Sequence, residues 1–178
     1  MKNIILIIFL LLTISCFSQN RKDTIVGKIN TEYLSELVLD VLNERRALSN
    51  ISLVKLGKNV YNCAEYQAAY MSTFSKLSHS NGNFFRGVHL NELNDRLSYF
   101  NVKSERISYE VGTATYTYVL GHYFFTYEEF ANHIIDNLFQ SKTHKLCMMS
   151  NRSVFAGFSC KYGIFNGREV IYTCGVFD

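Results

Sequence analysis

The chain has 178 residues, of which 48% are hydrophobic and 15% aromatic, and its formal net charge at pH 7 is +3. This length suits one domain of about 100–200 residues, and the composition supplies material for a sizeable core. The charge is small and Lys and Arg are dispersed, so nucleic acid and anionic membrane surfaces are not expected partners.

The N-terminus has the pattern of an export signal. Lys2 precedes an uninterrupted apolar run over residues 4–12, which is shorter than the roughly 20 residues of a transmembrane helix but fits a secretory signal peptide. We therefore predict a signal peptide over residues 1–18, cleavage before Gln19, no transmembrane segment after cleavage, and a secreted or periplasmic protein. Lipidation at Cys16 is the alternative, and it also leads out of the cytoplasm.

Residues 19–32 are predicted to be an N-terminal extension, and the domain itself to cover residues 33–178. The first helix is expected over residues 34–45, because apolar residues recur there with the i, i+3, i+4 spacing of an amphipathic helix. These residues are Leu34, Leu37, Val38, Val41 and Leu42. Thr31 lies just ahead of them, where a capping residue is expected.

A second helix is predicted over residues 56–78, with an apolar side that includes Val60, Ala68 and Met71. Continued at about 100° per residue, this helix turns His79 toward the same interior side. His79 therefore has two interpretations. An imidazolium is stabilised at a helix C-terminus by the macrodipole, whereas an inward-facing imidazole is a candidate ligand.

The middle of the chain reads as a polar, irregular segment over residues 80–105, followed by short strands at 107–111 and 115–119. A third helix opens at Thr126, since Glu129 completes a T-x-x-E capping box. It is expected to end at the segment Ser141-Lys-Thr-His144, which places a second histidine at a helix terminus.

Two final strands, over residues 154–162 and 169–177, are joined by Asn166-Gly167, a strong hairpin signal. A hairpin centred on Gly167 puts Cys160 opposite Cys174, and we predict a disulfide between them. Of the other mature-chain cysteines, Cys63 is then expected as a buried thiol and Cys147 is unassigned. The succession of elements predicts an α+β fold with helices packed on a small antiparallel sheet.

Three polar residues at element ends or among apolar neighbours are candidate site residues: His79, Glu110 and His144. Two imidazoles and a carboxylate are a reasonable ligand set for zinc, and the same groups suit acid–base chemistry near neutral pH. The remaining histidines, His89, His122 and His133, are expected at the surface or in packing.

Motifs spread over residues 34–177 resemble, in their order, one known family. They are Val41-Leu-Asn-Glu-Arg45, Leu53-Val-Lys-Leu56, Phe74-Ser-Lys-Leu-Ser-His79-Ser, Asn94-Asp-Arg96-Leu, Tyr109-Glu110-Val, Ser141-Lys-Thr-His144, Phe155-Ala-Gly-Phe158 and Tyr172-Thr-Cys-Gly-Val-Phe177. This order is similar to that of the CAP superfamily, or SCP-like proteins, which includes cysteine-rich secretory proteins, antigen 5 and plant pathogenesis-related proteins. Its bacterial members carry the arginine segment.

The resemblance implies an α-β-α sandwich whose cavity holds His79, Glu110 and His144, with zinc or another divalent metal bound by the two histidines. It implies a secreted domain that binds a small molecule, lipid or envelope component without catalysis. One alternative is an envelope-directed hydrolase with His79 or His144 as base, Glu110 as its orienting group and Ser78 or Ser80 as nucleophile. Another is an interaction scaffold in which these three polar residues have no function.

The sequence also departs from the family pattern. Tyr109 and Val111 replace the Gly and Asn that flank the strand glutamate, and Ser141 falls where many members carry a second glutamate. Glu128 and Glu129 are expected at the far end of that helix, and the chain contains no tryptophan.

Overall fold

The computed structural model describes residues 20–178 except 26, 83, 104–106, 120–121 and 124–125. The predicted signal peptide, its cleavage site and Cys16 lie outside the described residues. The helices are α2 (Thr31–Leu48), α3 (Lys58–Phe74), α4 (Leu93–Tyr99), α5 (Tyr127–Gln140) and α6 (Lys142–Met148). The strands are β1 (Lys55–Leu56), β2 (Tyr109–Tyr116), β3 (Tyr118–Val119), β4 (His122–Tyr123), β5 (Phe155–Phe165) and β6 (Arg168–Phe177).

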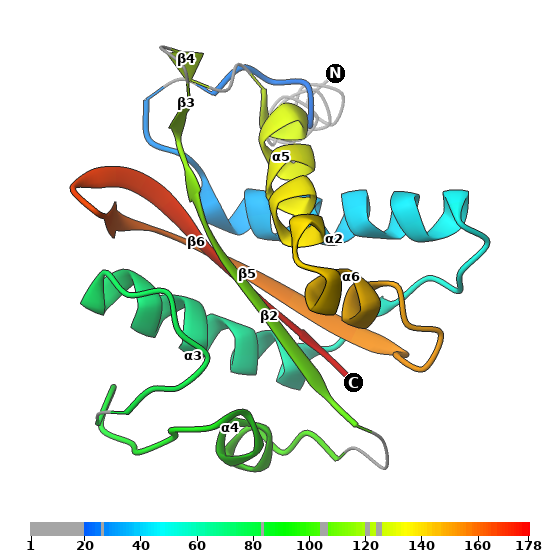
Figure 1. Ribbon diagram of the computed structural model, residues 1–178, viewed down its shortest axis with the longest axis vertical. Helices are drawn as coiled ribbons and strands as arrows, with labels where there is room; N and C mark the ends of the chain where they lie inside the picture. The colour runs from blue at the N-terminus through cyan, green and yellow to red at the C-terminus, as the bar shows by residue number, and fades with distance from the viewer. Residues whose placement is uncertain (1–19, 26, 83, 104–106, 120–121, 124–125) are drawn as a thin grey trace, which may run out of the picture.

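A four-stranded sheet in the order β1-β5-β6-β2 forms the middle layer. The three long strands are antiparallel, as predicted, and β1 adds two parallel pairs at the start of β5, so the complete sheet is mixed. Helices α2, α5 and α6 lie on one side of the strands and α3 and α4 on the other (Figure 1). The predicted α+β architecture is confirmed.

Each face of the sheet has its own apolar core, because successive side chains of a strand point to opposite faces. Along β6, Ile171 and Phe177 pack in the core with α2 and α5, whereas Tyr172 and Cys174 pack in the core with α3 and α4. At Gly157 of β5, an added Cβ would lie 2.4 Å from the Cα of Tyr61. Glycine is therefore required there for α3 to approach the sheet.

The register of the hairpin between β5 and β6 determines whether the predicted disulfide can form. Its two central residues, Asn166 and Gly167, both have positive φ, 50° and 75°, as in a type I′ turn. The turn is therefore centred between them, one half-residue before Gly167. Cys160 consequently pairs with Thr173 rather than with Cys174.

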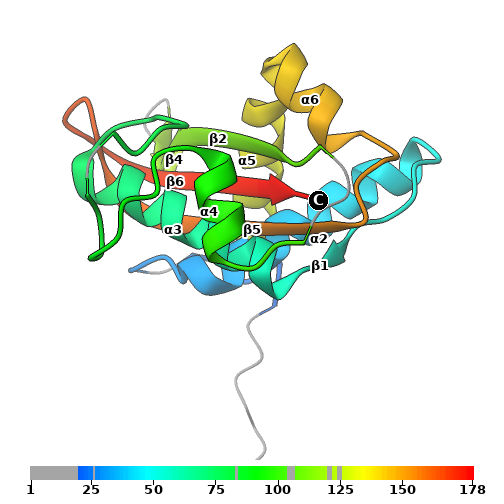
Figure 2. The same ribbon diagram turned by 90° about the horizontal axis from the view of Figure 1, so that it is seen from below.

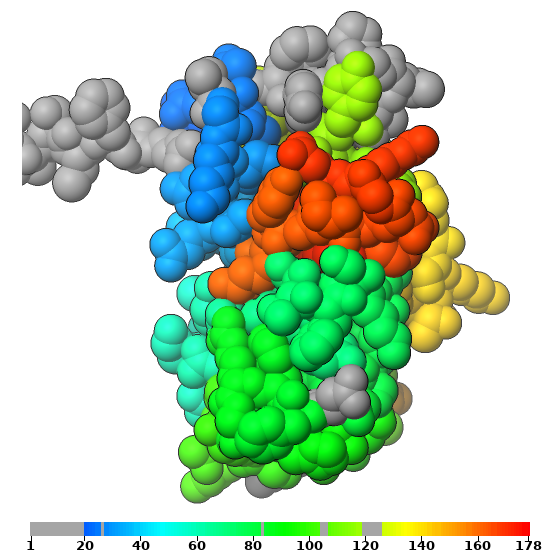
Figure 3. All heavy atoms as spheres, turned by 90° about the vertical axis from the view of Figure 1, so that its left-hand side faces the viewer, coloured from blue at the N-terminus to red at the C-terminus, as the bar shows by residue number. Residues whose placement is uncertain are grey.

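A register difference of one residue sends side chains to opposite faces of a sheet. Cys160 lies in the core with α2, and Cys174 in the core with α3, so the predicted disulfide is wrong. Within the described chain, all four cysteines are free thiols. Figure 3 shows the hairpin turn at the surface, between the N-terminal residues and α3.

The helix starts follow local capping chemistry. The side chain of Asn30, not that of Thr31, caps α2 by accepting a hydrogen bond from the amide of Tyr33 at 3.1 Å. The predicted capping box of Thr126 and Glu129 is confirmed at the start of α5.

Two helices and the strands between residues 107 and 119 differ from the expectation. Helix α4 occupies part of the segment predicted to be irregular, and α6 follows α5 directly, where the chain was expected to leave the helix. The two strands predicted between residues 107 and 119 are instead the single strand β2 followed by the short β3.

Residues of the N-terminal extension pack on the domain. Arg21 forms ion pairs with Glu44 of α2 at 2.6 Å and with Glu128 of α5 at 3.0 Å. The backbone amide of Asn30 donates to the hydroxyl of Tyr127 at 2.9 Å. Among the described helices, none combines the length and apolar character needed to cross a membrane.

Candidate functional site

His79 lies beyond α3, in a segment without regular structure. The helix ends at Phe74, and Ser75 adopts the left-handed conformation with φ of 51°. The ring of His79 is therefore outside the last helical turn, and neither helix capping nor helical periodicity accounts for its position. The helix was predicted to reach residue 78 but ends at Phe74. The predictions that His79 lies at its C-terminus and continues its apolar side were therefore both wrong.

The segment that carries His79 is held by polar contacts of its own. The side-chain amide of Gln67 donates to the carbonyl of Ser78. The hydroxyl of Ser78 donates to the carbonyl of Ser80 at 2.8 Å and accepts from the amide of Ser80 at 3.1 Å. These bonds form a tight turn around His79, whose side chain remains 58% exposed.

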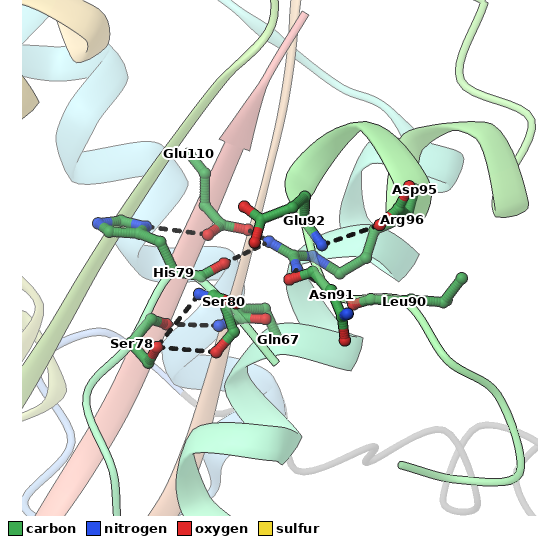
Figure 4. Close-up of polar contacts among 10 residues, drawn as sticks. All are labelled: Gln67, Ser78, His79, Ser80, Leu90, Asn91, Glu92, Asp95, Arg96 and Glu110. Atoms are coloured by element: carbon green, nitrogen blue, oxygen red, sulfur yellow. Dashed lines mark hydrogen bonds and ion pairs between the residues drawn. The ribbon is translucent and has the colours of Figure 1, made fainter. Parts of the chain in front are cut away.

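Glu110 is the acceptor at the centre of the site. It lies on β2 opposite Val176 of β6, and its side chain is only 4% exposed. One carboxylate oxygen lies 2.9 Å from Nδ1 of His79, and the other accepts from Nη2 of Arg96 at 2.7 Å (Figure 4). Both oxygens of this buried carboxylate are therefore engaged by donors.

Arg96 was not among the predicted site residues. It projects from α4 and its side chain is fully buried. In addition to Glu110, its guanidinium donates to the backbone carbonyls of His79 at 3.0 Å and Asn91 at 3.0 Å. Its helix begins with a capping box between Glu92 and Asp95. The sequence analysis missed this box because its residues are not the usual Ser or Thr followed by Glu or Gln.

His144 approaches from the other layer of the fold. Ser141 caps α6 by accepting a hydrogen bond from the amide of His144 at 3.3 Å, so His144 lies in the first turn of α6 rather than at the end of α5. The ring centres of His79 and His144 are 5.9 Å apart, with an interplanar angle of 75°. Strand β2 runs between α6 and α4 (Figure 2). The structure thus brings together all three predicted residues.

The two imidazoles differ in proton affinity. The hydrogen bond with Glu110 raises the pKa of His79, although partial burial and the positive charge of Arg96 act against this rise. Burial lowers the pKa of His144, and the neighbouring His79 lowers it further. As pH rises, His144 is therefore the first of the pair to become neutral, the form in which histidine binds metals.

As metal donors, the residues offer two imidazole nitrogens. Glu110 is committed to His79 and Arg96, and within the described ranges no group of three or more His, Cys, Asp or Glu side chains is arranged to hold a metal ion. The 5.9 Å between ring centres is a span that one ion can bridge, given zinc–nitrogen distances of about 2.0–2.1 Å. A carboxylate behind a histidine is also the usual support of a metal ligand.

Other predicted features have structural roles. Glu129 belongs to the capping box at the start of α5, and Glu128 there pairs with Arg21, so both lie at the far end of that helix from His144, as predicted. His89 is exposed, and the side chain of His122 lies outside the described residues. Three cavities of about 350, 560 and 460 Å³ are lined by other residues, mainly of the N-terminal segment, α2 and α3.

Solved structures share this fold. They include an extracellular protein containing an SCP domain from Bacillus anthracis str. Ames, with 16% identity and a TM-score of 0.60. An outer surface protein from Borrelia burgdorferi has 12% identity and a TM-score of 0.57. A cysteine-rich secretory protein from Staphylococcus aureus subsp. aureus Mu50 has 12% identity and a TM-score of 0.54.

The three matches cover 85%, 86% and 85% of this chain, and 45%, 98% and 40% of the respective solved chains. The chain therefore spans less than half of the Bacillus and Staphylococcus proteins. No protein-family model and no curated protein sequence matches it. At these identities the likeness establishes the fold, which is the SCP-type, or CAP-like, fold that the order of the motifs predicted.

Proposed function

We propose that this protein is an exported, non-enzymatic SCP-fold domain that binds a divalent metal ion through His79 and His144, with zinc as the first candidate. The bound ion supplies a positively charged centre at which a small molecule, lipid or other envelope component is recruited. The observation that carries this proposal is the meeting of the two rings, with one of them backed by a buried carboxylate.

The roles of the residues follow from their chemistry. A carboxylate only accepts hydrogen bonds, so Glu110 holds the Nδ1 proton of neutral His79 and leaves its other ring nitrogen with a lone pair. Partial burial lowers the pKa of His144, which favours the neutral form that can donate a lone pair to a metal. Export is supported by the charged and apolar pattern of residues 1–18, and the structurally similar proteins include an extracellular and an outer surface protein.

The pairing of His79 with Glu110 also favours a second candidate, a hydrolase in which His79 acts as base. Its nucleophile is the difficulty. Of its two candidates, Ser78 and Ser80, the hydroxyl of Ser78 forms both hydrogen bonds of their turn and is committed to the backbone. Ser80 enters that turn through its backbone, and the described polar contact of the His79 ring is with Glu110 rather than with a serine. For this reason we favour binding over hydrolysis.

The experiment is zinc titration by calorimetry of the metal-free protein at neutral pH. The His79→Ala/His144→Ala variant should lose binding while keeping its circular dichroism spectrum. His89→Ala is the matched control, since it removes one exposed histidine outside the site. Affinity should fall as the pH decreases, because the imidazoles protonate.

Equal zinc affinity of the double variant and the parent contradicts the proposal. A screen on peptides and cell-wall polymers separates the second candidate: turnover that depends on His79 establishes the hydrolase. For the location, mass spectrometry of the mature protein should show Gln19 as the first residue. A diacylglyceryl group on Cys16 shows the lipoprotein alternative, and an uncleaved cytoplasmic protein contradicts export.

A further inference from the structure

Arg96 contacts the backbone of His79 directly and its ring indirectly, through Glu110. One guanidinium nitrogen, Nη2, donates both to the backbone carbonyl of His79 and to the carboxylate of Glu110, which contacts the ring of His79. The other, Nη1, donates to the carbonyls of Leu90 and Asn91. A single buried side chain thus connects the loop that carries His79, the loop before α4, and strand β2.

These contacts determine which ring nitrogen of His79 carries the proton. The guanidinium only donates and the carboxylate only accepts, so the ring must donate from Nδ1. In the neutral ring the lone pair is then on Nε2. In Figure 4 this second nitrogen points away from Glu110, on the outer side of the ring.

We propose that Arg96 is the positioning residue of the site, and that it fixes the tautomer of His79 by fixing the orientation of the group at position 110. This inference concerns the site of the proposed function, but its central prediction requires no metal. It assigns a role to a residue that contacts neither a ligand nor the lone pair of His79.

The substitution Glu110→Gln tests this inference, because an amide has one accepting end and one donating end. If Arg96 sets the orientation, the amide oxygen accepts from Arg96 and the amide nitrogen faces Nδ1 of His79. That nitrogen donates, so Nδ1 has to accept and the proton moves to Nε2. Without control by Arg96, the amide can also turn its oxygen toward His79, and the proton then stays on Nδ1.

The readout is the pair of imidazole ¹⁵N chemical shifts of His79 in the metal-free protein. They are measured at about pH 9.5, well above the ordinary histidine pKa of about 6.5. The parent should be mainly the Nδ1–H form and Glu110→Gln mainly the Nε2–H form. In Arg96→Met/Glu110→Gln the amide can turn either end toward His79, so the Nδ1–H fraction should be larger than in Glu110→Gln. This double variant also avoids an unpaired buried charge.

A parent ring that is mainly Nε2–H, or a Glu110→Gln ring that stays Nδ1–H, overturns the inference. So does a double variant, shown by circular dichroism to be folded, in which the Nδ1–H fraction is no larger than in Glu110→Gln. If the double variant does not fold, the single substitution still overturns the inference when its ring stays Nδ1–H.

Zinc titration then separates the two proposals. Glu110→Gln should weaken zinc binding by about 10–100-fold, the usual effect of changing the partner of a ligating histidine. A parent that does not bind zinc, together with the expected tautomers, refutes the proposed function and leaves the role of Arg96 intact. If the parent binds zinc but the tautomer is unchanged in Glu110→Gln, the role of Arg96 is refuted and the proposed function stands.

Discussion

Replacing Arg46 should destabilise the protein far more than replacing its neighbour Arg45. Arg46 is fully buried, and its guanidinium donates to the carbonyl of Ser52 at 2.8 Å and to that of Ser150 at 2.9 Å. A third bond goes to the carbonyl of Met148 at the end of α6. The last carbonyls of a helix have no partner within the helix, so Arg46 supplies a donor to the carbonyl of the buried Met148.

The magnitude follows from these three bonds. Hydrogen bonds from a charged donor contribute about 1.5–3 kcal/mol each, and relief from burying the charge offsets part of their loss, so we expect Arg46→Ala to cost roughly 3–5 kcal/mol. Arg45 instead is partly exposed; it pairs with Asp136 at 3.2 Å and donates to the side-chain oxygen of Asn132 at 2.9 Å. Its replacement by alanine should cost less than about 1 kcal/mol.

The measurement is urea unfolding of the parent, Arg45→Ala, Arg46→Ala and Arg46→Lys, followed by circular dichroism. A change of stability alone shifts the midpoint and leaves the slope unchanged. Arg46→Lys keeps the charge but not the fork of donors, so its midpoint should lie between those of the parent and Arg46→Ala. Similar midpoints for Arg45→Ala and Arg46→Ala would refute the argument from burial.

Two further predictions concern titratable groups. Because its pKa is raised in the folded state, His79 contributes stability that is complete below pH ~6.5 and disappears as the pH rises through its folded pKa, so His79→Asn should be most destabilising in acid. The lowered pKa of His144 has the opposite sign, and histidine titrations by NMR should place its midpoint below that of His79; a reversed order contradicts the assignment. Of the thiols, Cys147 is half-buried and Cys63, Cys160 and Cys174 are buried, and burial raises the pKa of Cys63 to about 12 and that of Cys160 to about 11. Maleimide should therefore label Cys147 first in the folded protein and all four thiols in urea, whereas two thiols that stay unlabelled in urea would reveal a disulfide.

The long elements were predictable because each buries a periodic apolar face. The stripe on α2, the capping box of α5 and the Asn166-Gly167 turn are local signals, and the structure follows all three. The disulfide prediction failed on a detail that composition does not contain. A two-residue turn pairs residues around a point between its central positions, and this half-residue places Cys160 and Cys174 on opposite faces of the sheet.

The short helices were missed because apolar burial does not define them. Helix α4 buries only Arg96 and Leu97, and α6 only Met148. A seven-residue helix whose largest buried residue is an arginine does not show the amphipathic pattern on which sequence prediction relies. The resemblance to a known family marked the segment around Arg96, but its contacts with His79 and Glu110 arise only in the folded chain.

The two buried arginines explain how a site of surface histidines is held in place. His79 lies in a loop and His144 on a helix of seven residues, in which only Met148 is buried. Arg96 binds the backbone at His79, and Arg46 binds the carbonyls at the end of the helix that carries His144. Each histidine is thus attached to a different core of the sandwich through charged hydrogen bonds to backbone carbonyls, which are directional where apolar packing is not. We therefore expect the 5.9 Å between the rings to increase when either arginine is replaced.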